Sequence, residues 1–110
     1  MSILRNLAVD NAVQLADSIQ VKPHQVVSMS LSRSEHVQMT LFAFAKGEEV
    51  SEESYFGDTV YIGVEGEVRI QTDYREVKLQ QGAATMVPSG VLHAVRGKDE
   101  FKMLQITVME

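Results

Sequence analysis

The chain has 110 residues, 45% hydrophobic and 23% charged, a composition typical of one globular domain. Its formal net charge is −5 and it has no basic stripe, which disfavours nucleic acid and anionic membranes as partners. The absence of cysteine excludes disulfides, thiolate metal sites and cysteine nucleophiles, and it fits a reducing cytoplasm.

Residues 1–24 give weak structural signals and are expected to form an N-terminal extension of the same domain. Arg5, Asp10 and Asp17 interrupt their apolar residues, so the segment lacks the continuous core of a signal peptide. A weak helical pattern is confined to this segment. No apolar run in the chain approaches the roughly 20 residues of a membrane-spanning helix. We therefore expect a cytoplasmic protein.

From about residue 25 onward, apolar and polar residues alternate in the pattern of β-strands. Residues 26–32 place valine, methionine and leucine on one face and serines on the other. Residues 37–45 are apolar on both faces and are expected to lie between two packed layers. The polar residues 46–54 are expected to form a loop before a strand at 58–64.

The second half of the chain continues as short strands separated by turns, beginning with a hairpin turn at 65–67. Further strands are expected at 68–72, 77–79, 83–87, 91–95 and 101–108. Turns recur about every eight to twelve residues, which is typical of a β-sandwich or barrel. The expected fold class is therefore all-β, in one domain.

The segment GAATMVPSGVLHAV at 82–95 resembles the second conserved motif of the cupin superfamily. This motif has Gly, Pro, Gly and His at fixed spacing, and its positions are filled in register by Gly82, Pro88, Gly90 and His93. The last position of the motif is usually Asn, whereas here it is Gly97.

The first cupin motif is matched only in part. Gly47 and Gly66 occupy its two glycine positions with the spacing intact. Its three metal-ligand positions fall on Glu53, Tyr55 and Thr59. The conserved glycines and proline shape turns, so the resemblance implies the fold. It predicts a cupin double-stranded β-helix, a jelly-roll-like barrel, over residues 25–110.

In metal-dependent cupins, three histidines and one glutamate bind the ion inside the barrel. The equivalent positions here hold His93, Glu53, Tyr55 and Thr59. The first three could bind a divalent ion, but a threonine hydroxyl is a poor ligand and one histidine rarely holds a transition metal tightly. We therefore expect no bound cofactor, and a divalent metal on His93, Glu53 and Tyr55 is kept as the alternative.

The same positions are the candidates for a ligand pocket. The motif directs His93 into the barrel mouth, with a structural role bonded to backbone as the alternative. Tyr61 should share a strand face with Thr59 and bring a second hydroxyl inward. The candidate pocket residues are His93, Tyr55, Glu53, Tyr61 and Thr59. His24 and His36 lie off the motif and are expected at the surface.

The leading hypothesis is a small cupin that binds a small organic molecule in the barrel without a tightly bound metal. The second is a metal-dependent dioxygenase, isomerase or lyase with a non-standard ligand set. The third is a regulatory or interaction module that uses the outer faces of its sheets. The sequence does not decide whether the protein is an enzyme. The resemblance also implies a homodimer formed by sheet packing, in keeping with strands that are apolar on both faces.

Overall fold

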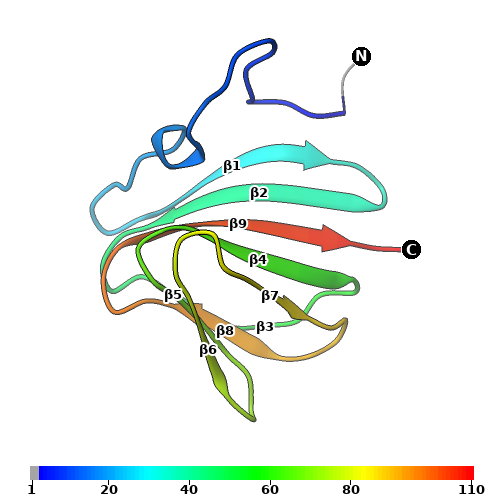
Figure 1. The fold of residues 1–110 in the computed structure, drawn as a ribbon. Coiled ribbons are helices and arrows are strands. Elements are labelled where there is room, and N and C mark those ends of the chain that lie inside the picture. The colour runs from blue at the N-terminus through cyan, green and yellow to red at the C-terminus, as the bar shows by residue number, and fades with distance from the viewer. Residues whose placement is uncertain (1–2) are drawn as a thin grey trace.

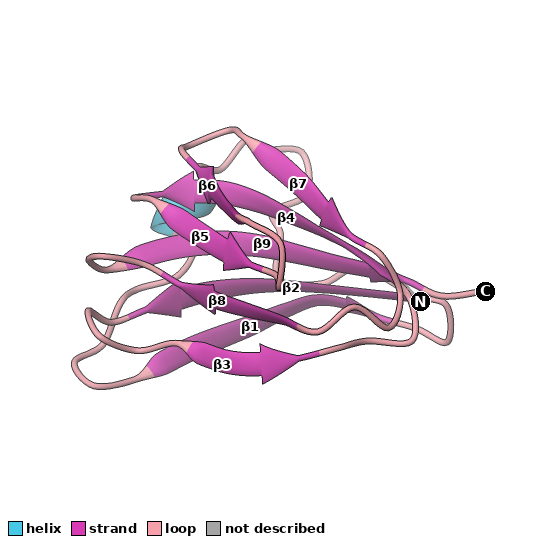
Figure 2. Cartoon of the chain, turned by 90° about the horizontal axis from the view of Figure 1, so that it is seen from below, coloured by secondary structure: helices cyan, strands magenta, loops and turns pink. Residues whose placement is uncertain are grey.

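The computed structural model describes residues 3–110, and residues 1 and 2 of the expected N-terminal extension lie outside them. Within this part, two antiparallel β-sheets pack face to face (Figures 1 and 2). The larger sheet contains β1 (Val26–Arg33), β2 (Val37–Phe44), β4 (Asp58–Glu65), β7 (Ala84–Val87) and β9 (Phe101–Val108). The smaller sheet contains β3 (Val50–Glu53), β5 (Val68–Gln71), β6 (Glu76–Leu79) and β8 (His93–Arg96). The all-β fold class predicted from the sequence is confirmed.

The strand order is β1-β2-β9-β4-β7 in the larger sheet and β3-β8-β5-β6 in the smaller sheet. The last strand, β9, therefore lies between β2 and β4 in the centre of the larger sheet. Its pairing with β2 runs from Phe101 opposite Phe44 to Val108 opposite Val37. Because side chains alternate between faces, every second residue of β9 points into the space between the sheets.

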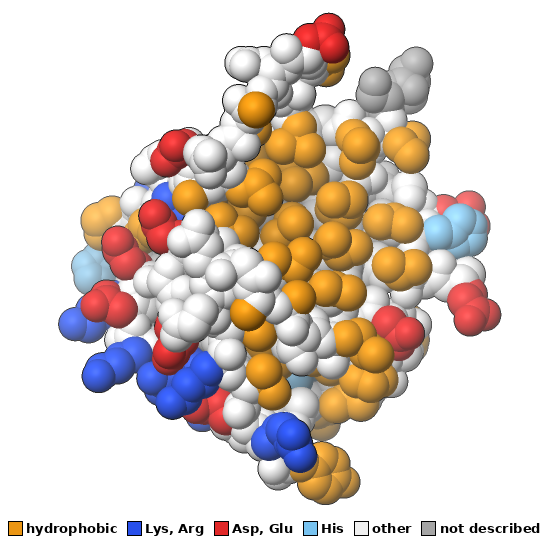
Figure 3. All heavy atoms as spheres, in the orientation of Figure 1, with side chains coloured by type: hydrophobic (Ala, Val, Ile, Leu, Met, Phe, Trp, Pro, Cys, Tyr) orange, Lys and Arg blue, Asp and Glu red, His pale blue; other side chains and the backbone are white. Residues whose placement is uncertain are grey.

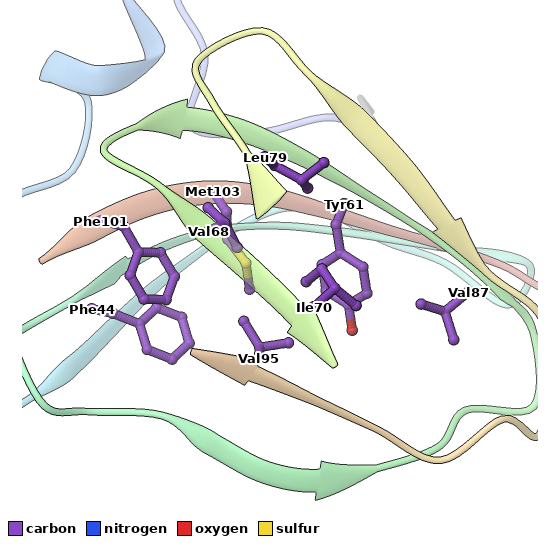
Figure 4. Packing of buried hydrophobic residues seen from close by; sticks show 9 residues of the cluster. All are labelled: Phe44, Tyr61, Val68, Ile70, Leu79, Val87, Val95, Phe101 and Met103. Carbon is purple, nitrogen blue, oxygen red and sulfur yellow. The ribbon is translucent and has the colours of Figure 1, made fainter. Parts of the chain in front are cut away.

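A hydrophobic cluster extends through that space, from the stacked rings of Phe44 and Phe101 to Tyr61 and Val87 (Figure 4). Its buried members are Phe44, Tyr61, Val68, Ile70, Leu79, Val87, Val95, Phe101 and Met103. Phe44 and Phe101 stack with their ring centroids 4.5 Å apart, and Phe42 packs against the cluster. Burying one such side chain stabilises the fold by about 1.5–3 kcal/mol, so this cluster holds the two sheets together.

The expected loop at residues 46–54 is in part a strand, because Val50–Glu53 form β3. This strand pairs with β8 and places Glu53 opposite His93. The pairing register shifts within β3, which breaks the period-two pattern, and edge strands commonly carry charged residues. Backbone pairing defines β3, and side-chain alternation alone could not reveal it.

Two glycines show how turns and core packing constrain the chain. Gly66 has a φ of 73°, and a Cβ there would lie 2.7 Å from the backbone oxygen of Glu100. Gly97 stands where the family usually has Asn, and a Cβ there would lie 2.5 Å from ring carbon Cδ1 of Phe101. Only glycine fits against this ring, so the departure from the motif at position 97 reflects core packing.

The N-terminal extension contains a short 3-10 helix, η1 (Leu15–Asp17), where the sequence shows a weak helical pattern. Before η1, Leu4 forms an isolated β-bridge with Ser32 at the outer edge of β1. The backbone N–H of Arg5 also donates to the carbonyl oxygen of Leu31. These contacts attach the extension to the first strand. No helix within residues 3–110 is long and apolar enough to cross a membrane.

The outer face of the larger sheet carries a second hydrophobic cluster. Its buried members are Ile19, Leu31, Leu41, Ala43, Val64 and Leu104. Residues of η1 and of the segment after it pack on part of this face. Figure 3 shows hydrophobic side chains forming a continuous area over the larger sheet, with charged side chains around its margin. The larger sheet therefore has an apolar face on both sides.

Candidate functional site

His93 and Glu53 occupy neighbouring positions on the smaller sheet. His93 is the first residue of β8, Glu53 is the last residue of β3, and the two are directly paired across the strands. Directly opposed residues in an antiparallel pair place their side chains on the same face, with Cβ atoms about 5 Å apart. The missed strand β3 is therefore the element that brings the carboxylate beside the imidazole.

The turn of the second motif positions the loop that follows β3. Gly90 has a φ of 80°, and its N–H donates to the carbonyl oxygen of Tyr55 at 2.8 Å. The N–H of Ser89 donates to the carboxylate of Asp58 at 3.0 Å. These bonds hold Tyr55 next to His93, with their ring centroids 6.0 Å apart. The turn thus places a candidate residue as well as closing the barrel.

The larger sheet supplies the facing wall of the site. On β4, Tyr61 pairs with Gln105 of β9, and Thr59 pairs with Thr107 of the same strand. Tyr61 and Thr59 point inward as predicted, and both are fully buried. Figure 4 shows the Tyr61 ring directed from β4 toward the smaller sheet.

Tyr61 and His93 form a buried hydrogen bond between the sheets, with 2.6 Å between Tyr61 Oη and His93 Nε2. His93 Nδ1 lies 2.9 Å from the carbonyl oxygen of Val91. Because a carbonyl oxygen only accepts, Nδ1 carries the proton, and Nε2 of the neutral imidazole accepts from the Tyr61 hydroxyl. Burial raises the pKa of Tyr61 well above its usual value, so the phenol stays protonated. Both ring nitrogens of His93 are occupied.

Tyr55 and Glu53 form a second hydrogen-bonded pair, which lies closer to the surface. The Tyr55 hydroxyl donates to Oε2 of Glu53, and both side chains are partly buried. Burial and, after it, the bond to the Glu53 carboxylate raise the pKa of Tyr55 to about 12, while a hydrogen bond with the Gln105 side chain opposes the rise. At neutral pH the phenol of Tyr55 therefore stays protonated, beside the Glu53 side chain at the edge of the site.

Thr59 lies one inward-facing position before Tyr61 on β4. Its Oγ1 is 3.0 Å from Oγ1 of Thr107, and both threonines are buried. The structure therefore brings Glu53, Tyr55, Tyr61 and His93 into two linked pairs. The hydroxyl of Thr59 belongs to a separate contact.

The donor set does not fit the metal centre that the family implies. Among residues 3–110, no group of three or more His, Cys, Asp or Glu side chains is placed to hold a metal ion. Nε2 of His93 accepts from Tyr61, and the Thr59 hydroxyl bonds to a neighbouring threonine. A metal on the alternative set of His93, Glu53 and Tyr55 would require the imidazole to release the Tyr61 hydroxyl.

Sequence reasoning missed Gln105 as a member of the site. Gln105 lies on the inward-facing alternation of β9, and its side chain contacts Tyr55. The inward-facing positions of β9 change from apolar to polar at Gln105, and this change in the sequence could have indicated a polar site. His24 and His36, by contrast, are exposed as predicted.

The fold is similar to several solved structures. A cupin superfamily protein from Desulfitobacterium hafniense is 45% identical, with a TM-score of 0.94 over 99% of this chain and 100% of that chain. A conserved protein of unknown function from Streptococcus pyogenes is 24% identical, with a TM-score of 0.93 over 100% and 96% of the two chains.

A cupin 2 conserved barrel domain protein from Leptotrichia buccalis is 28% identical, with a TM-score of 0.80, and the match covers 84% of this chain and 45% of that chain. No family model and no curated protein matches the chain. The 45% identity over the whole length agrees with the motif glycines and the sheet order described above. The chain belongs to the cupin superfamily.

Proposed function

We propose that the protein binds a small organic molecule at the mouth of the barrel without a tightly bound metal. Glu53 and Tyr55 would contact the ligand, and the Tyr61–His93 pair would form the floor beneath them. The observation that carries this proposal is the bond from the Tyr61 hydroxyl to His93 Nε2. This bond occupies Nε2 of His93, the one residue that matches a metal-binding histidine of the cupin motifs. Glu53 and Tyr55 remain partly exposed to solvent.

A thermal-shift screen with small metabolites tests this proposal. Compounds that raise the melting temperature of the unmodified protein should lose much of this effect with Glu53→Gln and with Tyr55→Phe. Glu52→Gln is the matched control, because Glu52 is the exposed neighbour on the same strand. If every stabilising compound acted equally on Glu53→Gln, Tyr55→Phe and Glu52→Gln, the assignment of the site would be wrong.

A metal-dependent enzyme is the second candidate, and it is favoured by the direct pairing of Glu53 with His93. A carboxylate and an imidazole on one sheet face are two common ligands of divalent ions. Elemental analysis of freshly purified, untagged protein separates the two candidates. One metal ion per chain would favour the enzyme, and a substoichiometric amount would favour metal-free binding.

We also propose that the outer face of the larger sheet is covered by a second copy of this chain. Aromatic residues and Met103 fill the interior at one end, which favours a function for the outer faces, as in an interaction module. The continuous apolar area over the larger sheet is the surface that such a contact would bury (Figure 3).

The expected cytoplasmic location stays a prediction, and fractionation of host cells would test it.

Light scattering coupled to size exclusion tests the dimer. The unmodified protein should elute with twice the mass of the chain. The double variant Ile106→Glu with Met86→Glu, which places two charges on this face, should elute as a monomer with an unchanged circular dichroism spectrum. Leu92→Glu is the control, since Leu92 is 52% exposed and Met86 54%. A monomeric unmodified protein would overturn the dimer.

A further inference from the structure

We infer that the ligand of this site is an organic ammonium, an amine carried as a cation, that binds to the carboxylate of Glu53. This inference rests on the proposed function, because it names the class of molecule that would bind at the barrel mouth. Its starting point is a carboxylate that the fold leaves without a cationic partner.

Glu53 is partly buried on the inner face of the smaller sheet, beside His93. The ion pairs within residues 3–110 join Glu35, Glu67, Glu76 and Glu65 to basic side chains, and none of them involves Glu53. A carboxylate that is partly shielded from water interacts more strongly with a positive partner than one that is fully exposed. A cationic ligand would supply that partner.

The neighbouring imidazole makes its hydrogen bonds to other groups. The Nδ1 proton of His93 is donated to Val91, and Nε2 accepts from Tyr61. Both ring nitrogens of His93 are therefore bonded to groups other than Glu53, and the ion pairs within residues 3–110 include none between the two.

The carboxylate also has unused hydrogen-bonding capacity. An ionised carboxylate offers about four lone-pair positions, and the structure gives Glu53 one side-chain donor, the hydroxyl of Tyr55. A primary ammonium carries three N–H donors and no acceptor. It matches a site that already has its acceptors in place and lacks donors and positive charge.

The aromatic rings beside the carboxylate favour the same class of ligand. The rings of Tyr55 and His93 lie with centroids 6.0 Å apart, and the Tyr55 side chain is partly exposed. The face of a tyrosine ring attracts a cation within about 6 Å. An alkylammonium would meet a carboxylate and a ring face at once.

Three four-carbon probes of nearly equal size test the inference: n-butylammonium, n-butanol and butyrate. Titration followed by protein-detected NMR should show that n-butylammonium shifts the backbone resonances of β3 and β8, while n-butanol and butyrate leave them in place. The affinity for n-butylammonium should fall roughly ten-fold or more with Glu53→Gln, since a hydrogen bond to a charged group is lost. Tyr55→Phe keeps the ring and should weaken binding less.

Glu52→Gln is the control and should bind n-butylammonium as the unmodified protein does. Equal or tighter binding of n-butanol or butyrate would overturn the cationic class but leave the small-molecule proposal standing. The absence of shifts at β3 and β8 with all three probes would overturn the inference as well. Shifts there with Mg²⁺ or Zn²⁺ and not with n-butylammonium would assign the carboxylate to a metal ion. If Glu53→Gln and Tyr55→Phe kept the full stabilisation by every compound in the metabolite screen, the proposed function itself would be wrong.

Discussion

The two ends of β9 line one interior but differ in chemistry. Phe101 and Met103 belong to the hydrophobic cluster, whereas Gln105 and Thr107, on the same inward face, lie among hydroxyls and an imidazole. The apolar end requires only matching volumes. The polar end requires a partner for each buried polar atom, and within residues 3–110 no buried side-chain nitrogen or oxygen lacks one. One end therefore supplies stability, and the other supplies groups for recognition.

The largest effect is expected when a large side chain is removed from the apolar end. Phe101→Ala removes a ring that stacks on Phe44, so the free energy of unfolding should fall by about 3–5 kcal/mol. Urea unfolding measures the change. Val108→Ala, at the half-exposed end of the same strand, is the control and should cost much less. Equal losses for the two variants would mean that the cluster does not dominate stability.

A smaller effect is expected at the polar end. Tyr61→Phe keeps the buried ring but leaves His93 Nε2 without its donor, and the free energy of unfolding should fall by about 1–3 kcal/mol. Tyr74→Phe, at an exposed tyrosine, should leave stability unchanged. If Tyr61→Phe were as stable as the unmodified protein, the bond between the sheets would contribute little, and His93 would be freer to bind a ligand than proposed.

The smallest effect concerns alkaline pH. The pKa of Tyr55 is raised from 10.0 to about 12 in the folded protein, so above pH 10 the unfolded chain releases this proton first. The unfolded state then binds fewer protons than the native state, and stability falls as pH rises through this window. Between about pH 9 and pH 12, the melting temperature should decline less steeply for Tyr55→Phe than for the unmodified protein. Parallel curves for the two proteins would contradict the placement of this phenol.

Much of the fold could be predicted because its signals are local. The alternation at 26–32 and 101–108 corresponds to β1 and β9, and the turn glycines lie where the motifs place them. β3 escaped prediction because its register shifts and its residues are mostly polar. An edge strand of this kind is defined by its partner β8, which only the folded chain reveals.

The candidate site was predictable as a set of positions and unpredictable as a set of bonds. The spacing of the motifs singled out Glu53, Tyr55 and His93, and period two added Tyr61. The bond from Tyr61 to His93 joins two sheets, so its existence depends on how the sheets pack. No spacing rule within one strand contains that information, and it decides whether His93 is free to act as a ligand.

The contact between the N-terminal extension and β1 limits strand addition at one edge of the larger sheet. β1 lies at one edge of the larger sheet, and such an edge can template the addition of a strand from another molecule. The bridge from Leu4 to Ser32 and the bond from Arg5 to Leu31 occupy part of that edge. The extension thus restricts strand addition at the β1 edge, whereas β7 forms the opposite edge of the same sheet.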